Sequence, residues 1–156
     1  MIRICDVSEC VGAIDFLVAW NSDYWSDRTP EVTSEQWRRS YEECVGTRGR
    51  EIPVTLVGLE DGRVFGGVTI VKVDDIQDFP DYSPWIAALI VGETYRGKNL
   101  GLTLMDAALA KVRKLGYSEA FLWTDSRKEW YVRQGWYEIH HMTFGKVEAS
   151  IMRYEF

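Results

Sequence analysis

The chain has 156 residues, of which 46% are hydrophobic and 13% are aromatic. A chain of this length can bury roughly 70% of its unfolded surface in one core, so we expect a single domain over residues 1–156 rather than a disordered or disulfide-stapled chain. The 18 Lys and Arg residues against 24 Asp and Glu residues give a net charge of −6. An acidic surface suits phosphate groups poorly, so neither nucleic acid nor a membrane surface is an expected partner.

Three cysteines, Cys5, Cys10 and Cys44, form no C-x-x-C pair. Their odd number fits neither a disulfide framework nor a structural zinc site, so we expect no metal site and a reducing, cytoplasmic environment. A secretory signal is not expected, because acidic residues interrupt the first ten positions. The longest apolar run, residues 85–91, is far shorter than the ~20 residues of a membrane span.

The first half of the chain contains signals for two helices and a hairpin. Thr33 and Gln36 have the spacing of a capping box, which predicts that a helix begins there. Asp61-Gly62 lies between two β-type runs and is a strong hairpin signal, and the Gly66-Gly67 doublet indicates a bulge or a close backbone approach. The predicted elements are a strand at residues 2–7, a helix at 9–20, a polar aromatic loop at 21–32, a helix at 33–45 and strands at 54–60 and 63–73.

The second half alternates strands and helices. An apolar strand, a helix closed by Gly116 and another apolar strand make a β-α-β unit, in which the two strands run parallel. The hairpin before this unit is antiparallel, so the chain predicts an α/β fold with a sheet of mixed direction. The predicted elements are strands at residues 85–91 and 120–124, helices at 99–114 and 127–134, and final strands at 136–143 and 147–155.

The loop between the first strand of this unit and its helix has the composition of an anion site. Gly97 and Gly101 allow the backbone to approach a ligand closely, and Arg96 and Lys98 add positive charge. Unpaired backbone N–H groups and the helix dipole favour an anion at the start of the helix. Asn99 either caps the helix or adopts the left-handed conformation. The sequence therefore predicts a pyrophosphate site.

One interpretation of this loop is a phosphate-binding P-loop. Gly92, Gly97 and Lys98 match the pattern G-x-x-x-x-G-K-[ST], and Asp125 at the end of a hydrophobic strand could support Mg²⁺. However, Asn99 lacks the hydroxyl that a P-loop uses for Mg²⁺, and an antiparallel hairpin before the loop suits such a core poorly. A P-loop-like nucleotide binder is kept only as an alternative.

A second pattern extends further along the chain. It resembles the acetyl-CoA signature of the GNAT superfamily of N-acetyltransferases, [RQ]-x-x-G-x-[GA], and reads Leu89-x-Val91-x-x-x-Tyr95-Arg96-Gly97-x-Asn99-Leu100-Gly101. Asn99 stands where the family has its middle glycine, and Glu93 replaces a frequent proline. Residues 83–87 are also similar to a small bacterial subgroup of the family. A downstream segment is similar to the family's F-Y-x-x-x-G-[FW] element and reads Trp130-Tyr131-Val132-Arg133-Gln134-Gly135-Trp136.

The resemblance implies a GNAT-like fold: a mixed, mostly antiparallel sheet with a central pair of parallel strands that splay apart, and helices on both faces. It implies acetyl-CoA as the cofactor, with the pantetheine amides on the strand edge at Leu89, Ile90 and Val91. A backbone N–H near Val91 or Gly92 would polarise the thioester carbonyl. The pyrophosphate would lie on the helix start, which is formed by Arg96, Gly97, Lys98, Asn99, Leu100 and Gly101.

The resemblance also implies the reaction. A neutral amine attacks the acetyl carbonyl directly, and Tyr131 acts as general acid to the CoA thiolate. The general base is open: Glu93 and Asp125 lie at the ends of the two parallel strands, and His140 and His141 lie in the next strand. A non-catalytic acyl-CoA-binding or sensor module on the same fold is the alternative if Tyr131 is dispensable.

The acceptor is expected to be a small-molecule or peptide amine. Aromatic faces and carboxylates attract an ammonium group, and both occur near Tyr24 and Trp25, while the loop at residues 74–81 is acidic. The two terminal strands could extend a sheet across a homodimer. The candidate substrate residues are Tyr24, Trp25, Trp85, Trp123 and His140.

Overall fold

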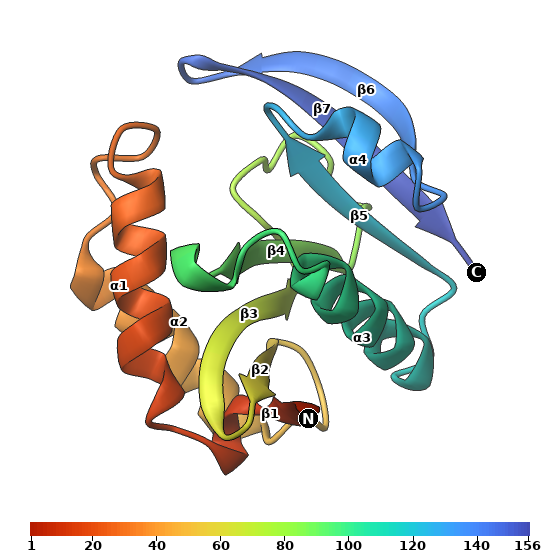
Figure 1. Ribbon diagram of the computed structural model, residues 1–156. Coiled ribbons are helices and arrows are strands. Elements are labelled where there is room, and N and C mark those ends of the chain that lie inside the picture. Colours follow the sequence, from red (N-terminus) through yellow and green to blue (C-terminus); the bar gives the residue numbers. More distant parts are fainter.

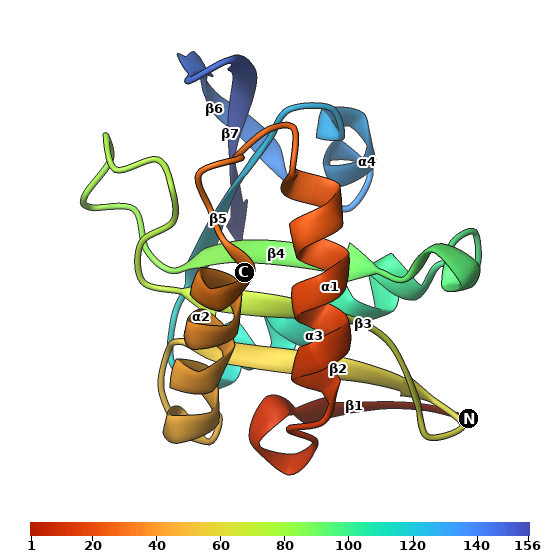
Figure 2. The same cartoon turned by 90° about the vertical axis from the view of Figure 1, so that its left-hand side faces the viewer.

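A computed structural model describes residues 1–156 and contains one seven-stranded sheet in the order β1-β2-β3-β4-β5-β7-β6. Helices α1 and α2 cover one face of this sheet and α3 covers the other (Figures 1 and 2). The elements in chain order are β1 (Ile2–Asp6), η1 (Val7–Glu9), α1 (Ala13–Trp25), α2 (Ser34–Thr47), β2 (Val54–Glu60), β3 (Arg63–Val71), β4 (Trp85–Val91), η2 (Glu93–Tyr95), α3 (Leu100–Lys114), β5 (Glu119–Thr124), α4 (Lys128–Val132), β6 (Tyr137–Phe144) and β7 (Val147–Glu155).

The sheet has one parallel strand pair, β4 and β5, and every other neighbouring pair is antiparallel. The parallel strands share a single residue pair, Trp85 with Phe121. The Phe121 N–H also donates to the carbonyl oxygen of Pro84 at 2.9 Å. Beyond this point the two strands diverge (Figure 1). The predicted mixed sheet with a splayed parallel pair and helices on both faces is therefore confirmed.

Each face of the sheet has its own apolar core. The face under α3 buries Leu104, Met105 and Val112 against strands β2 to β5. The opposite face buries Leu17 of α1 and Tyr41 of α2. None of the helices combines the length and apolar character required to cross a bilayer.

Helix α1 is longer and lies later in the chain than the sequence predicts, because it runs through Asn21 to Trp25. Only residues 21–25 of the run 21–32 that we interpreted as a loop are helical, and residues 26–32 lie outside any helix or strand. Asn21 is fully buried, and its side-chain amide donates to Leu17 O at 3.1 Å and to the Tyr41 hydroxyl at 2.7 Å. This extension places Tyr24 and Trp25 on the last turn of a helix.

Helix α2 begins with the predicted capping box of Thr33 and Gln36. Its end differs from the prediction, because the helix continues through Gly46 and the left-handed residue at its C-terminus is Arg48, with φ of 52°. The next residue, Gly49, also has a positive φ, and the chain turns there toward β2.

The sheet is bulged on both sides of the glycine doublet of β3. Toward β2, Gly66 pairs with Gly58 and Val64 pairs with Leu59, so Phe65 is an extra residue of β3. Toward β4, the extra residue lies in β4. Ala87 pairs with Thr69 and Ile90 pairs with Gly67, so Ala88 and the residue after it oppose one β3 residue. Ala88 has a φ of 52°, which a non-glycine residue rarely adopts. The doublet also allows the predicted close approach of two backbones, because a Cβ built on Gly66 would lie 2.3 Å from the carbonyl oxygen of Ile90.

We expect Gly66→Ala to lower the free energy of unfolding by about 1–3 kcal/mol, because the added methyl group forces β3 and β4 apart. The matched control is Gly46→Ala in α2, where no heavy atom lies within 4 Å of the added Cβ and alanine is favoured over glycine by roughly 0.5–1 kcal/mol. Urea unfolding of both variants measures the difference. Equal stabilities would contradict the close approach at Gly66.

Candidate functional site

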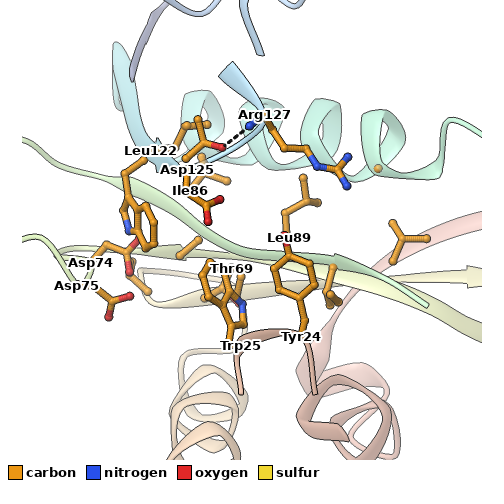
Figure 3. A pocket seen from close by; sticks show the side chains of 18 of the residues that line it. Tyr24, Trp25, Thr69, Asp74, Asp75, Ile86, Leu89, Leu122, Asp125 and Arg127 are labelled. Atoms are coloured by element: carbon orange, nitrogen blue, oxygen red, sulfur yellow. Dashed lines mark hydrogen bonds between the residues drawn. The ribbon is translucent and has the colours of Figure 1, made fainter. Parts of the chain in front are cut away.

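A cavity of about 760 Å³ opens where β4 and β5 diverge. Figure 3 shows Leu89 in its centre, Asp74 and Asp75 on one side and Arg127 on the other. The wall is built from several elements and includes Tyr24, Trp25, Thr69, Asp74, Asp75, Ile86, Ala87, Ala88, Leu89, Ile90, Val91, Arg96, Gly97, Asn99, Leu100, Gly101, Leu102, Leu122, Trp123, Thr124, Asp125, Arg127, Trp130 and Tyr131.

One end of the cavity is the N-terminus of α3. Asn99 has a φ of 61°, and its side chain caps no backbone N–H. Of the two predicted roles, the structure therefore shows the left-handed conformation and not the side-chain cap. The first bond to a helix carbonyl at this end runs from the Thr103 N–H to Asn99 O at 3.2 Å. The N–H groups of residues 100–102 therefore have no acceptor within the helix, and these residues line the cavity.

The two basic side chains of this loop have different environments. Arg96 lines the cavity, and its Nε donates to the carbonyl oxygen of Val91 at 3.0 Å. Lys98 is absent from the cavity wall, and its ammonium lies 5.9 Å from the centre of the Tyr95 ring. Arg96 is therefore tied to the end of β4, while Lys98 is held at the outside of the loop.

The floor of the cavity is the bulged part of β4. Leu89, Ile90 and Val91 line it as predicted, together with Ala88. Of the two backbone donors that we considered for a carbonyl oxygen, the Gly92 N–H donates to Phe65 O at 2.8 Å and is committed to the sheet.

Tyr131 lines the cavity from α4. Its ring packs edge-on against Trp130 at 4.9 Å and against Trp136 at 6.2 Å between ring centres. Burial raises the pKa of Tyr131 to about 12, with Arg127 lowering it and Tyr24 raising it to smaller extents. The phenol is consequently protonated throughout the neutral pH range.

Asp125 lines the cavity at the end of β5 and is paired with Arg28, a residue that the sequence analysis missed. Arg28 Nε lies 2.9 Å from Asp125 Oδ2. The same guanidinium lies 4.7 Å from the centre of the Tyr24 ring and 5.7 Å from that of Trp25. The four-residue spacing from Tyr24 to Arg28 would have been the signal, but it has meaning only if the helix continues past Asn21.

The acidic side of the cavity contains Asp74 and Asp75, which follow β3. Burial, followed by the adjacent charge of Asp75, raises the pKa of Asp74 to about 7, while a hydrogen bond from the Trp123 side chain lowers it. Asp75 is exposed to solvent at the rim of the cavity, and partial desolvation by the surrounding residues, followed by the charge of Glu31, raises its pKa. The Trp123 ring in turn lies 5.7 Å from the Trp25 ring.

Three further predicted residues lie outside the cavity wall. Glu93 is exposed on the turn η2. Trp85 is fully buried, and its indole donates to Tyr82 O at 2.7 Å. His140 lies on β6 with its Nε2 2.8 Å from the Tyr82 hydroxyl and its ring stacked on Phe79. The structure therefore gathers Tyr24, Trp25 and Trp123 of the candidate substrate residues, but not Trp85 or His140.

The sequence profile described as the acetyltransferase (GNAT) family matches residues 14–136. The span covers most of the chain, including β4, the start of α3 and Tyr131. The chain therefore belongs to the GNAT family of acetyltransferases, and the P-loop alternative is set aside. No curated protein sequence matches the chain.

Solved structures with low sequence identity have the same fold. An acetyltransferase from Streptococcus agalactiae is 15% identical, with a TM-score of 0.73 over 99% of this chain and 98% of its own. YncA from Salmonella typhimurium, solved with its cofactor acetyl-CoA, is 20% identical, with a TM-score of 0.68 over 99% and 92%. PaiA N-acetyltransferase from Thermoplasma acidophilum, solved with coenzyme A, is 16% identical, with a TM-score of 0.70 over 100% and 99%. The similarity to one bacterial subgroup stays a prediction.

We expect Asn99→Ala to lower the free energy of unfolding by about 1 kcal/mol, because the left-handed conformation brings the alanine Cβ too close to a backbone carbonyl oxygen. Asn99→Gly restores the glycine of the family signature and should stay within about 0.5 kcal/mol of the wild type. Urea unfolding of the two variants checks the expectation. An alanine variant more stable than the glycine variant would contradict the left-handed conformation at this position.

Proposed function

We propose that the protein is an N-acetyltransferase that moves an acetyl group from acetyl-CoA to a primary amine. One observation carries the proposal: a single cavity brings together the open edge of β4, the N-terminus of α3 and the Tyr131 side chain. This combination offers donors for a phosphate, amide partners for an extended chain and a proton donor at one place.

The residues of the cavity fit acetyl-CoA. The edge of β4 that faces β5 is unpaired after Trp85, so Leu89, Ile90 and Val91 offer backbone groups to the pantetheine amides. The start of α3 offers N–H groups and positive potential to the pyrophosphate. In this proposal the pyrophosphate-binding residues are those of the loop that line the cavity, and Lys98 adds only its charge from outside the wall. They are Arg96, Gly97, Asn99, Leu100 and Gly101. Two structures of the same fold contain acetyl-CoA or coenzyme A.

When bound, acetyl-CoA supplies an acetyl group activated as a thioester. The bulge in β4 supplies the donor for its carbonyl oxygen, because the extra residue of a bulge leaves the regular hydrogen-bond ladder. The positive φ of Ala88 reorients the peptide group that joins it to Leu89. We therefore assign the Leu89 N–H to the oxygen that becomes negative during attack, in place of the Gly92 N–H.

Tyr131 is the proposed general acid. The amine nitrogen forms a bond to the acetyl carbon, the carbon–sulfur bond breaks, and the phenol donates its proton to the sulfur. The raised pKa keeps this proton on the phenol until the sulfur becomes negative. A positioned acid of this kind contributes about 10²–10⁴-fold to the rate.

The acceptor loses its proton to a carboxylate, directly or through water. Of the four sequence candidates for the base, Asp125 lines the cavity, whereas Glu93, His140 and His141 do not. Arg28 occupies Oδ2 of Asp125, and Ser126 donates to Oδ1 at 3.2 Å. We therefore propose that Asp125 accepts the proton of the amine through a water molecule, with Glu93 as the second candidate for the general base.

The compartment and the assembly also remain proposals. Cys5, Cys10 and Cys44 are free thiols, which fits the reducing, cytoplasmic environment expected from the sequence. Strand β7 is enclosed between β5 and β6, so a homodimer that extends the sheet would have to use β6 or β1.

We expect acetyl-CoA at 100 times its Kd to stabilise the protein by about 2.7 kcal/mol, and Tyr131→Phe to keep this stabilisation. The same variant should lower kcat by roughly 100-fold or more, because the proton donor is removed while the ring that packs against Trp130 remains. Thermal unfolding and release of the free CoA thiol measure the two effects.

Two outcomes contradict the proposal. Unchanged turnover in the Tyr131→Phe variant removes Tyr131 as the acid. Stabilisation by acetyl-CoA without thiol release across a panel of amines and peptide N-termini supports the sensor alternative instead.

A further inference from the structure

We propose that the preferred acceptor is a dication, with a second positive group bound at the acidic side of the cavity by Asp74, Asp75 and the Trp123 ring. The inference rests on the proposed acetyl transfer and names the kind of amine that the same cavity selects.

The first argument is charge. Asp125 already has a cationic partner in Arg28, whereas neither Asp74 nor Asp75 takes part in any ion pair of the structure. Burial and the neighbouring carboxylate raise the pKa of Asp74, and Glu31 adds further negative potential at Asp75. A positive group that enters the cavity relieves this repulsion, because an opposite charge favours the ionised carboxylate.

The second argument is the aromatic surface beside these carboxylates. The protein's own Arg28 guanidinium rests on Tyr24 and Trp25 and is paired with Asp125. The Trp123 ring lies 5.7 Å from the Trp25 ring, and Trp123 and Asp74 both line the cavity. An aromatic face with a carboxylate at its edge binds a cation. Trp123 and Asp74 therefore offer a cation the same kind of contact that the aromatic rings and Asp125 offer to Arg28.

The third argument is the length of the cavity. Val71, at the end of β3, pairs with Trp85, and the acidic residues follow shortly after Val71. The bulge at Leu89 lies four residues further along β4, about 13 Å at the rise of a strand. Between the two ends the cavity wall includes the apolar side chains of Ile86, Ala87 and Leu122. An aliphatic spacer suits this wall, with an amine at each end.

The test compares two amines that differ only in the second charge, 1,8-diaminooctane and octylamine. We expect the wild type to have a kcat/KM at least tenfold higher for the diamine, mainly through a lower KM. The double variant Asp74→Asn, Asp75→Asn should lower the diamine-to-octylamine ratio by at least tenfold. Asp78→Asn is the matched control, because Asp78 lies on the same loop, is exposed and is absent from the cavity wall.

Stabilisation by acetyl-CoA reports whether the double variant is folded, and the comparison of the two amines with the wild type needs no variant. Equal kcat/KM for the two amines in the wild type overturns the inference and leaves the proposed acetyl transfer intact. A ratio that the double variant and Asp78→Asn lower equally also overturns it. Binding of acetyl-CoA without acetylation of either amine overturns this inference, whereas the proposed function is overturned only if the whole panel of amines and peptide N-termini releases no thiol.

Discussion

The site depends on the single contact that holds two parallel strands together at one end. Trp85 and Phe121 are the only paired residues of β4 and β5, and both side chains are almost completely buried in a small cluster with Ile76, Ala149 and Ile151. β3 fixes the other edge of β4, and β7 fixes the other edge of β5. Each strand is therefore hydrogen-bonded along the edge that faces away from the other, and the two edges that face each other are free. The cavity opens between these free edges while the core on both faces of the sheet stays packed.

The cavity has opposite electrostatic character at its two ends. The N-terminus of α3 and Arg96 lie at one end, and Asp74 and Asp75 lie at the other. The net charge of −6 is an average over these regions. An anionic nucleotide and a cationic acceptor would enter such a cavity at different ends, so the field orients both before any specific contact forms.

The sequence was most informative where one local segment determines the structure. Strand β4, the start of α3 and the position of Tyr131 follow from spacing within short motifs, and the left-handed Asn99 follows from its place in the signature. It was less informative where the structure depends on a partner far along the chain. Helix α1 continues past Asn21, whose buried side-chain nitrogen donates to the Tyr41 hydroxyl, and no property of residues 21–32 reveals that partner.

The same limit applies to the site. A bulge is a relation between two strands, so the glycines of β3 indicated the extra residue of β3 opposite β2 but not the second bulge, in which β4 carries the extra residue. The sequence identified the carboxylates at the strand ends, but it did not show which of them lines the cavity. Asp125 is paired with Arg28, 97 positions away, while Glu93 is exposed on η2 and is absent from the cavity wall.

The turn after β5 connects the proposed acceptor side to the proposed acid. Asp125 receives Arg28 from the segment after α1, and the side-chain oxygen of Thr124 accepts the Arg127 N–H at 3.0 Å, just before α4 begins. Tyr131 follows one turn later, where its N–H donates to Arg127 O at 3.2 Å. The turn after β5 therefore joins the aromatic wall of Tyr24 and Trp25, through Arg28 and Asp125, to the start of the helix that carries Tyr131.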